Sequence, residues 1–324
     1  MRFLVCGGAG YIGSHMARLL AEHGHAVVVL DDLSNGHHQA VKWGPLLQVD
    51  LLHQDALCKV FDENAFDGVF HFAARSVVSE SVVRPFEYYR CNTMGTLNLL
   101  DAMRRYGVER FIFSSTASVF GLPLSAGIDE QHPRQPISPY GASKLMVEQM
   151  LVDAASAYGL RSVSLRYFNA AGAARDASIG EAHICETHLI PNVLRSVLGL
   201  VPPLNVYGCD YPTPDGTCIR DYVHVEDLAD AHLRAMNFLE SSPGAHAFNL
   251  GNGQGFSVRE VIDAASRVVG SQIPFVVAPR RAGDPDTLVA SSRKAREMLG
   301  WRARWTDLDE IIESAWRWHQ AQPW

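Results

Sequence analysis

The chain of 324 residues has no C-x-x-C cysteine pair, no apolar run of membrane-spanning length and no excess of positive charge. Its six cysteines are scattered singly, which favours reduced thiols over zinc ligands or a disulfide framework. The net charge of -7 argues against binding to nucleic acid or to an anionic membrane, because both require clustered positive charge. The default expectation is therefore a small-molecule ligand.

Targeting signals and repeats are also missing. The first ten residues, MRFLVCGGAG, place a glycine cluster where a signal peptide would need its apolar centre. The chain has no internal repeat and no low-complexity linker. These features predict a cytoplasmic protein with no nucleic-acid and no membrane partner.

Fourteen histidines raise the question of a metal site. His23 with His25, and His37 with His38, lie close together in sequence but fall in expected loops. They lack the carboxylate or cysteine partners that a metal site needs. We expect solvated loop histidines and no metal site.

Short apolar runs alternate along the chain with longer segments of helical period. Such nearly continuous apolar strands, separated by helices, are typical of a parallel sheet covered on both faces. The sequence therefore predicts a doubly wound α/β domain of the Rossmann type. The expected strands are 2–6, 26–31, 46–50, 68–73, 110–115 and 162–169, and the expected helices are 11–23, 53–62, 85–106 and 139–158.

This rhythm changes after about residue 170. Segments such as 205–222, NVYGCDYPTPDGTCIRDY, are rich in Gly, Pro, Asp and Thr and predict irregular structure. We expect a Rossmann domain over 1–170, with a return contribution from about 219–250, and a smaller ligand-binding lobe from 171–218 and 251–324. The helices expected in this part are 188–199, 226–240, 257–268 and 307–318.

A glycine-rich turn follows the first expected strand. Gly8, Gly10 and Gly13 fit G-x-G-x-x-G, Gly7 adds a further glycine, and Asp31 ends the next strand. This context is typical of dinucleotide binding, because the glycines admit a pyrophosphate and the acid accepts from a ribose hydroxyl. An acid at this position favours NAD over NADP. The alternative is a tight turn that binds nothing.

The stretch SPYGASK, residues 138–144, places a tyrosine four residues before a lysine. Pro139 suits the first turn of a helix, so Tyr140 and Lys144 should lie on one helical face. Taken alone, the pair could equally be a surface Tyr and a surface Lys.

With these features together, the chain resembles the extended short-chain dehydrogenase/reductase superfamily and, within it, the UDP-glucose 4-epimerase family. The resemblance runs from Met1 to near Trp316, and the stretch YPTPDGTCIRDY, 211–222, is its most specific part. Further motifs that carry it are GGAGYIGSH, HFAARSVVSES, NTMGTLNLL, FSSTASVFG, RYFNAAGA, ETHLIP and RRAGDPD.

The resemblance implies NAD as cofactor, a UDP-hexose as substrate and a homodimer formed through the helices 85–106 and 139–158. It implies Tyr140 as catalytic base, Lys144 as its partner and Thr116 as a proton-relaying hydroxyl. For NAD it implies Gly7, Gly10, Tyr11, Ile12, Gly13, Asp31, Asp32, Asn35, Asp50, Leu51, Phe72, Asn92, Ser114 and Tyr167, besides Tyr140 and Lys144. For the UDP-sugar it implies Asn169, His188, Leu189, Val206, Tyr207, Arg220, Tyr222, Arg281, Asp284 and Leu288, besides Thr116.

Some positions depart from the family. Some members have a lysine where Ser76 stands, a serine at Thr116 and an asparagine at His188. Leu288 falls where members of narrow specificity carry a bulky tyrosine, which predicts room for a 2-acetamido group on the sugar.

The implied chemistry is reversible oxidation at C4 of the hexose, rotation of the 4-keto sugar and reduction on its opposite face. Tyrosine titrates near about 10, and an ammonium about 4 Å away could lower that value enough for Tyr140 to serve as a base near neutrality. We therefore expect Lys144, helped by the positively charged nicotinamide of NAD, to lower the pKa of Tyr140.

Three alternatives remain at this point. A nucleotide-sugar 4,6-dehydratase would need an Asp-Glu pair after Thr116, where Ala117 and Ser118 stand. A 4-epimerase of UDP-pentose or UDP-uronate shares the same motifs. A regulatory or structural NAD-binding protein would keep the fold without turnover.

Overall fold

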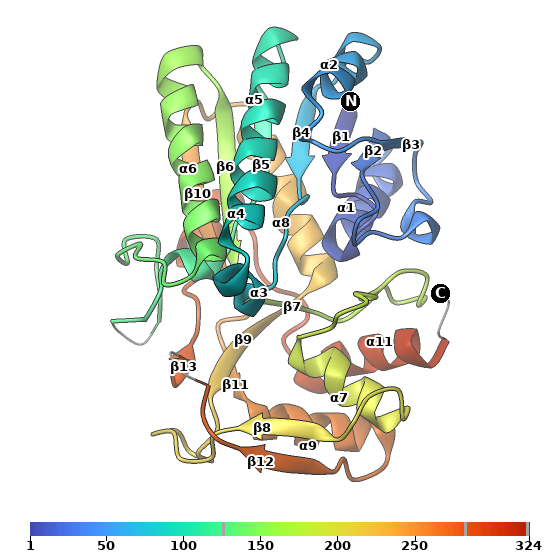
Figure 1. The fold of residues 1–324 in the computed structure, drawn as a ribbon, viewed down its shortest axis with the longest axis vertical. Helices are drawn as coiled ribbons and strands as arrows, with labels where there is room; N and C mark the ends of the chain where they lie inside the picture. The colour runs from blue at the N-terminus through green and yellow to red at the C-terminus, as the bar shows by residue number, and fades with distance from the viewer. Residues whose placement is uncertain (125–126, 282–283, 322–323) are drawn as a thin grey trace.

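The structure is a computed structural model that describes all residues except 125–126, 282–283 and 322–323. Its main element is a seven-stranded, fully parallel sheet in the order β10-β6-β5-β4-β1-β2-β3 (Figure 1). The strands are β1 (Arg2–Cys6), β2 (Ala26–Asp31), β3 (Leu46–Gln48), β4 (Gly68–His71), β5 (Arg110–Ser114), β6 (Arg161–Tyr167) and β10 (Ala245–Leu250). The predicted doubly wound α/β fold is confirmed.

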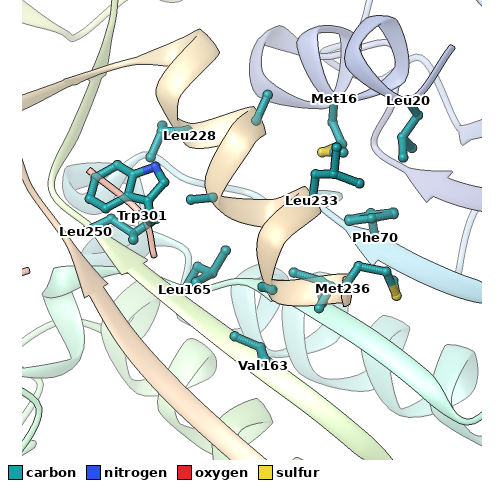
Figure 2. Packing of buried hydrophobic residues seen from close by; sticks show 14 of the residues in the cluster. Met16, Leu20, Phe70, Val163, Leu165, Leu228, Leu233, Met236, Leu250 and Trp301 are labelled. Carbon is teal, nitrogen blue, oxygen red and sulfur yellow. The ribbon is translucent and has the colours of Figure 1, made fainter. Parts of the chain in front are cut away.

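Helices cover both faces of this sheet. One face carries α1 (Tyr11–Glu22) and α8 (Val225–Phe238), and Figure 2 shows how Met16 and Leu20 of α1 and Leu233 and Met236 of α8 pack with Phe70 of the sheet. The opposite face carries α2 (Gln54–Asp62), α5 (Gly95–Arg105) and α6 (Pro139–Tyr158). Because successive strand residues point to opposite faces, apolar strands such as β1 feed both cores.

The expected helix 85–106 is helical throughout but not uniform. It consists of α4 (Pro85–Tyr88), a π-helical segment η2 (Tyr89–Met94) and α5. Two short helices were not predicted, α3 (Val78–Val83) and α10 (Arg293–Leu299), and short 3-10 turns occur at η1 (His38–Ala40) and η3 (Ala117–Val119).

The smaller elements gather below the large sheet in Figure 1. β9 (Ile219–His224) pairs with β7 (Asn169–Ala171), β11 (Gly255–Ser257) and β13 (Thr287–Leu288), while β8 (Leu204–Tyr207) pairs with β12 (Phe275–Ala278). The helices α7 (Leu189–Val197), α9 (Val258–Val269) and α11 (Leu308–Ala321) enclose a separate apolar core beside β9. The chain returns to the large sheet through α8 and β10. The residue bounds given above for the two lobes remain a prediction.

None of the helices in the described ranges combines the length and the apolar character needed to cross a membrane.

Four buried histidines should make the fold sensitive to acid. Burial lowers the pKa of His15 and His232 to about 4, and that of His71 and His224 to about 3. Between pH 6.5 and about 4 the unfolded chain therefore binds more protons than the folded chain, so stability present above pH 6.5 is lost as the pH falls.

We expect the free energy of unfolding to decrease by up to about 1.4 kcal/mol per pH unit for each such histidine in this window. Urea unfolding at pH 7, 6 and 5 measures it. In the His232→Leu variant the free energy of unfolding should decrease less steeply as the pH falls, since this histidine is fully buried. Equal stability of the unmodified protein at pH 7 and pH 5 would contradict the assignment.

Candidate active site

A cleft of about 1250 Å³ runs between the carboxyl edge of the seven-stranded sheet and the group of smaller elements around β9 (the smaller lobe). Its walls include the glycine turn after β1, the ends of β2, β4 and β5, the start of α6, and residues of β7, β9 and β13. Open parallel sheets bind their ligands at this edge.

The glycine turn is shaped so that no side chain fits. Gly7 adopts φ of +79°, and a Cβ there would lie 2.5 Å from the Ala73 nitrogen. A Cβ on Gly13 would lie 2.1 Å from the Gly7 carbonyl oxygen. Gly10 precedes α1 without a side-chain cap, so the first N–H groups of that helix are left for another acceptor.

The carboxylates at the end of β2 stand beside this turn. Asp31 is buried and accepts the N–H groups of Ala9 (3.0 Å) and Leu33 (2.9 Å). Burial raises the pKa of Asp31, and these two hydrogen bonds lower it in part. The bonds fix the carboxylate at the cleft wall, where its remaining lone pairs can accept from a ribose hydroxyl.

Tyr140 and Lys144 lie one turn apart in α6. The helix begins as the sequence predicts: the Ser138 hydroxyl accepts the Gly141 N–H at 3.2 Å, and Pro139 occupies the first turn. The buried Lys144 ammonium donates to the Ser114 carbonyl at 2.9 Å and lies 4.7 Å from the centre of the Phe113 ring.

Thr116 reaches the same place from the end of β5. Thr116 is 6 % exposed, its hydroxyl caps η3 by accepting the Ser118 N–H, and it lies near enough to the Tyr140 phenol to lower the pKa of that group. Two hydroxyls and an ammonium therefore converge in one corner of the cleft.

Burial dominates the electrostatics of this corner. It raises the pKa of Tyr140, and the nearby Thr116 hydroxyl offsets only part of that rise. Burial also lowers the pKa of Lys144 to about 8. The predicted lowering of the Tyr140 pKa combines Lys144 with a positively charged nicotinamide. Among the protein groups desolvation prevails, so ionising the phenol requires that further positive charge in the cleft.

The opposite wall carries the predicted sugar-side residues. Arg220 donates to the Asp284 carboxylate at 2.5 Å, and Leu288 is its neighbour through the parallel pairing of β13 with β9. Arg281 lies 4.0 Å over the Tyr207 ring. Asn169 donates to the Asp221 carbonyl at 2.9 Å. Two guanidinium groups and one amide thus border the cleft.

Most of the predicted site residues line the cleft, and five do not. Asn92 is buried and bonds to the backbone of Arg75 and to Ser143, so it fixes the loop after β4 instead. Tyr207 lies under Arg281. The other three, Leu189, Val206 and Tyr222, pack in the apolar core of the smaller lobe. Those on the wall are Gly7, Gly10, Tyr11, Ile12, Gly13, Asp31, Asp32, Asn35, Asp50, Leu51, Phe72, Ser114, Thr116, Tyr140, Lys144, Tyr167, Asn169, His188, Arg220, Arg281, Asp284 and Leu288.

Some residues of the wall were not predicted. Glu181 and His183 line the cleft close to Tyr11 and His188, and Arg75 lines it after β4. The repeated spacing of Glu and His in EAHICETH, 181–188, is a signal that could have identified the first two. The motif RRAGDPD lies partly outside the described residues, at 282–283.

Comparison with known proteins gives the following similarities. Residues 3–251 match the NAD dependent epimerase/dehydratase family. A UDP-glucose 4-epimerase of Lacticaseibacillus casei is 49% identical over 324 residues, covering 100% of this chain and 98% of its own length. The crystal structure of UDP-glucose 4-epimerase from Brucella ovis in complex with NAD has a TM-score of 0.95 and 49% identity, covering 98% of this chain and 97% of that one.

A further solved structure is similar over its whole length. It is UDP-glucose-4-epimerase from Stenotrophomonas maltophila with bound NAD and formylated UDP-arabinopyranose, with a TM-score of 0.96 and 40% identity. It covers 100% of this chain and 99% of its own.

Proposed function

This chain belongs to the NAD dependent epimerase/dehydratase family, and from that premise we propose that it is a UDP-glucose 4-epimerase that interconverts UDP-glucose and UDP-galactose. The observation that carries the proposal is the convergence of Tyr140, Thr116 and Lys144 in the cleft. The glycine turn lies on one side of these groups and Arg220 and Arg281 on the other.

The residues at the glycine turn fit NAD. Gly7 and Gly13 lie so close to neighbouring backbone that no Cβ fits, so the tight turn depends on glycine, and Asp31 is held at the wall by two backbone N–H groups. When bound, NAD supplies the chemistry of accepting hydride from C4 and returning it. Lys144 would hold a ribose hydroxyl, since its ammonium has donors beyond the one given to Ser114.

Tyr140 acts on the proton of the sugar 4-hydroxyl. The phenolate takes this proton as C4 is oxidised, and the phenol returns it when the 4-keto sugar is reduced. Thr116, which lies near the phenol, passes the proton between O4 and Tyr140. Because burial raises the pKa of Tyr140, the positive charges of Lys144 and of the nicotinamide ring must together lower it for the step to run near neutrality.

The sugar must rotate while its nucleotide stays bound. Arg220 and Arg281 can each pair with pyrophosphate oxygens through a planar guanidinium fork. Arg220 is already oriented by Asp284 at 2.5 Å, and Arg281 by the Tyr207 ring. The hexose between them and Tyr140 is then free to present either face.

Two other reactions share much of this machinery. A 4,6-dehydratase needs a carboxylate pair after the threonine, whereas Ala117 and Ser118 begin η3 at that point. A 4-epimerase of UDP-pentose or UDP-uronate is the second alternative, and the substrates tested below distinguish it.

We expect NAD to co-purify with the protein and not to be consumed, because the cofactor is regenerated in each cycle. Denaturing the purified protein and analysing the released nucleotide by chromatography measures this. The same assay with added UDP-galactose should leave the NAD content unchanged. Stoichiometric formation of NADH with UDP-galactose would instead make the protein a dehydrogenase.

The substrate range should extend to UDP-N-acetylglucosamine and UDP-N-acetylgalactosamine. Leu288 lines the cleft beside Arg220 and packs against the small apolar cluster that includes Phe120 and Ile128, and a leucine leaves space that a tyrosine ring would fill. We expect Leu288→Tyr to lower turnover of the acetylated sugars about 10- to 100-fold and to spare UDP-galactose. Coupled assays with both substrate pairs measure it.

The control for this variant is Leu288→Met, which keeps the volume and should keep both activities. Absence of any acetylated product with the unmodified enzyme would restrict the range to UDP-glucose and UDP-galactose. Equal losses for both substrates in Leu288→Tyr would show that this residue does not set the size limit.

A homodimer through the helices 85–106 (α4, η2 and α5) and 139–158 (α6) is part of the proposal. These adjoining helices expose large apolar side chains, which favours burial against a second copy. The most exposed are Phe86, Met94, Leu97, Met146, Val152 and Tyr158. We also propose a cytoplasmic location, supported by six free cysteines in the described chain.

A further inference from the structure

The connection between β7 and α7 carries a cluster that the proposed chemistry does not use. Residues 172–188 form no helix or strand, although they border the cleft. Long irregular connections inside compact domains usually have a function or a specific means of fixation. This one ends in EAHICETH, 181–188, where glutamate and histidine alternate.

Four side chains of this segment meet at one point. Glu181, His183, Glu186 and His188 each offer a ligand atom, and these atoms all lie within 4.8 Å of one another. The closest approaches are His183 Nδ1 to Glu181 Oε1 at 2.5 Å and His188 Nδ1 to Glu186 Oε1 at 2.6 Å. Both imidazoles are therefore directed at the carboxylates.

The cluster holds polar atoms that have no partner. The Glu186 side chain is 2 % exposed, yet its Oε2 has no hydrogen-bond partner among the described residues. The buried His183 Nδ1 also lacks one, since its approach to Glu181 is close but without hydrogen-bond geometry. Leaving such groups unpaired is costly, and a shared cation would satisfy both.

The charges of the cluster also favour a bound cation. Glu181 is 5 % exposed, and Glu186 is buried beside it, so two carboxylates are withdrawn from water. Among the described residues each carboxylate is paired with a histidine, Glu181 with His183 and Glu186 with His188, and with no arginine or lysine. One divalent cation with two neutral imidazoles would balance the two negative charges.

The backbone around the cluster is already fixed. The Glu181 carbonyl accepts the Trp318 indole N–H of α11 at 2.7 Å, and the Glu186 carbonyl accepts from Asn192 of α7 at 3.2 Å. Glu186 Oε1 also accepts the N–H groups of Thr187 and His188, each at 2.6 Å. The ligand set is thus held by two helices of the smaller lobe.

We propose that Glu181, His183, Glu186 and His188 bind one divalent zinc ion, which fastens the 172–188 connection to the cleft wall. Two imidazoles and two carboxylates form the N/O set that suits four-coordinate zinc, whereas calcium and magnesium prefer oxygen ligands alone. The expectation of no metal site rested on His23, His25, His37 and His38 and did not consider this quartet. In this arrangement His188 is a zinc ligand, so its predicted contact with the sugar would be indirect.

The test uses the purified full chain with its cofactor. Zinc content is measured by mass spectrometry after desalting, and Tm is measured after chelator treatment and after addition of zinc chloride or magnesium chloride. We expect about one zinc ion per chain and a rise in Tm of several degrees with zinc but not with magnesium. No retained zinc, together with no change in Tm at micromolar zinc chloride, would overturn the proposal.

Two double variants separate this site from surface histidines. His183→Asn/His188→Asn should lower bound zinc at least tenfold and abolish the zinc-dependent rise in Tm. His23→Asn/His25→Asn removes the same number of histidines from the end of α1 and should leave both unchanged. Equal zinc binding by both variants would overturn the proposal.

A milder variant addresses the case in which the first double variant does not fold. Glu186→Gln keeps the shape of the side chain but removes one negative charge, and circular dichroism reports its folding. It should weaken zinc binding at least tenfold, and zinc binding like that of the unmodified protein would overturn the proposal.

Discussion

Replacing Tyr140 with phenylalanine is expected to lower kcat for UDP-galactose epimerisation by about 10²- to 10⁴-fold, because the substitution removes the base that acts on the 4-hydroxyl. The ring remains, so the packing against Tyr88, whose ring centre lies 6.4 Å away, should be preserved. Steady-state kinetics and NAD content measure the outcome. We expect the variant to fold and to retain NAD.

A nearby tyrosine provides the matched control. The Tyr88 hydroxyl donates to the Val77 carbonyl and to Glu80 and takes no part in the proposed chemistry, so Tyr88→Phe should retain most of the activity. Adding Thr116→Ala to Tyr140→Phe should cause little further loss, since both groups serve one proton path. An unchanged kcat in Tyr140→Phe would contradict the role of Tyr140 as base and would favour the alternative, in which SPYGASK carries an ordinary surface Tyr and surface Lys.

The second large effect concerns stability and involves Glu148. Its carboxylate accepts from Arg166 Nε at 2.8 Å and Nη2 at 2.5 Å, and from the Ser115 hydroxyl at 2.7 Å. Both charged side chains are at most 4 % exposed. Glu148→Leu should therefore lower the free energy of unfolding by about 3–5 kcal/mol, because it leaves the Arg166 charge buried without its partner. Urea unfolding measures this loss.

The double variant Glu148→Leu/Arg166→Met tests the cause. Removing both charges should restore part of the stability lost in Glu148→Leu, since a buried pair can often be replaced by apolar side chains. Ser115 precedes Thr116, so the pair also fixes the strand end that carries the relay hydroxyl. If Glu148→Leu lost less than about 1 kcal/mol, or if the double variant were the less stable of the two, the account of this ion pair would be wrong.

The large sheet could be predicted from the sequence because its signals are local. Strands such as 26–31 are continuous apolar runs, and the glycines that follow β1 mark a turn that admits no Cβ. The helix 139–158 begins and ends at the predicted residues, since Ser138 and Pro139 start it and Gly159 ends it in the left-handed conformation. Local chemistry determined each of these boundaries.

The far wall of the cleft could not be predicted from local patterns. Arg220 and Leu288 become neighbours only because β13 pairs with β9, and a β13 of two residues gives no periodic signal. The short helix α3 escaped prediction because VSESVV is rich in β-branched residues. Residues of the wall such as Arg220 therefore depended on the family resemblance.

The pKa changes of the site residues also could not be predicted from the sequence. The spacing of Tyr140 and Lys144 predicts their proximity, but the sign of the pKa change depends on how deeply the phenol is buried. Burial of Val206 and Tyr222 in the smaller lobe likewise removes them from the cleft wall, although the resemblance included them.

The proposed 4-epimerase activity is measured by incubating the purified protein with UDP-galactose and following the anomeric and C4 protons of the sugar by proton NMR. We expect UDP-glucose to appear, the same equilibrium mixture to be approached from either sugar, and no net formation of NADH. Persistence of UDP-galactose alone, with NAD bound and the protein folded, would contradict it.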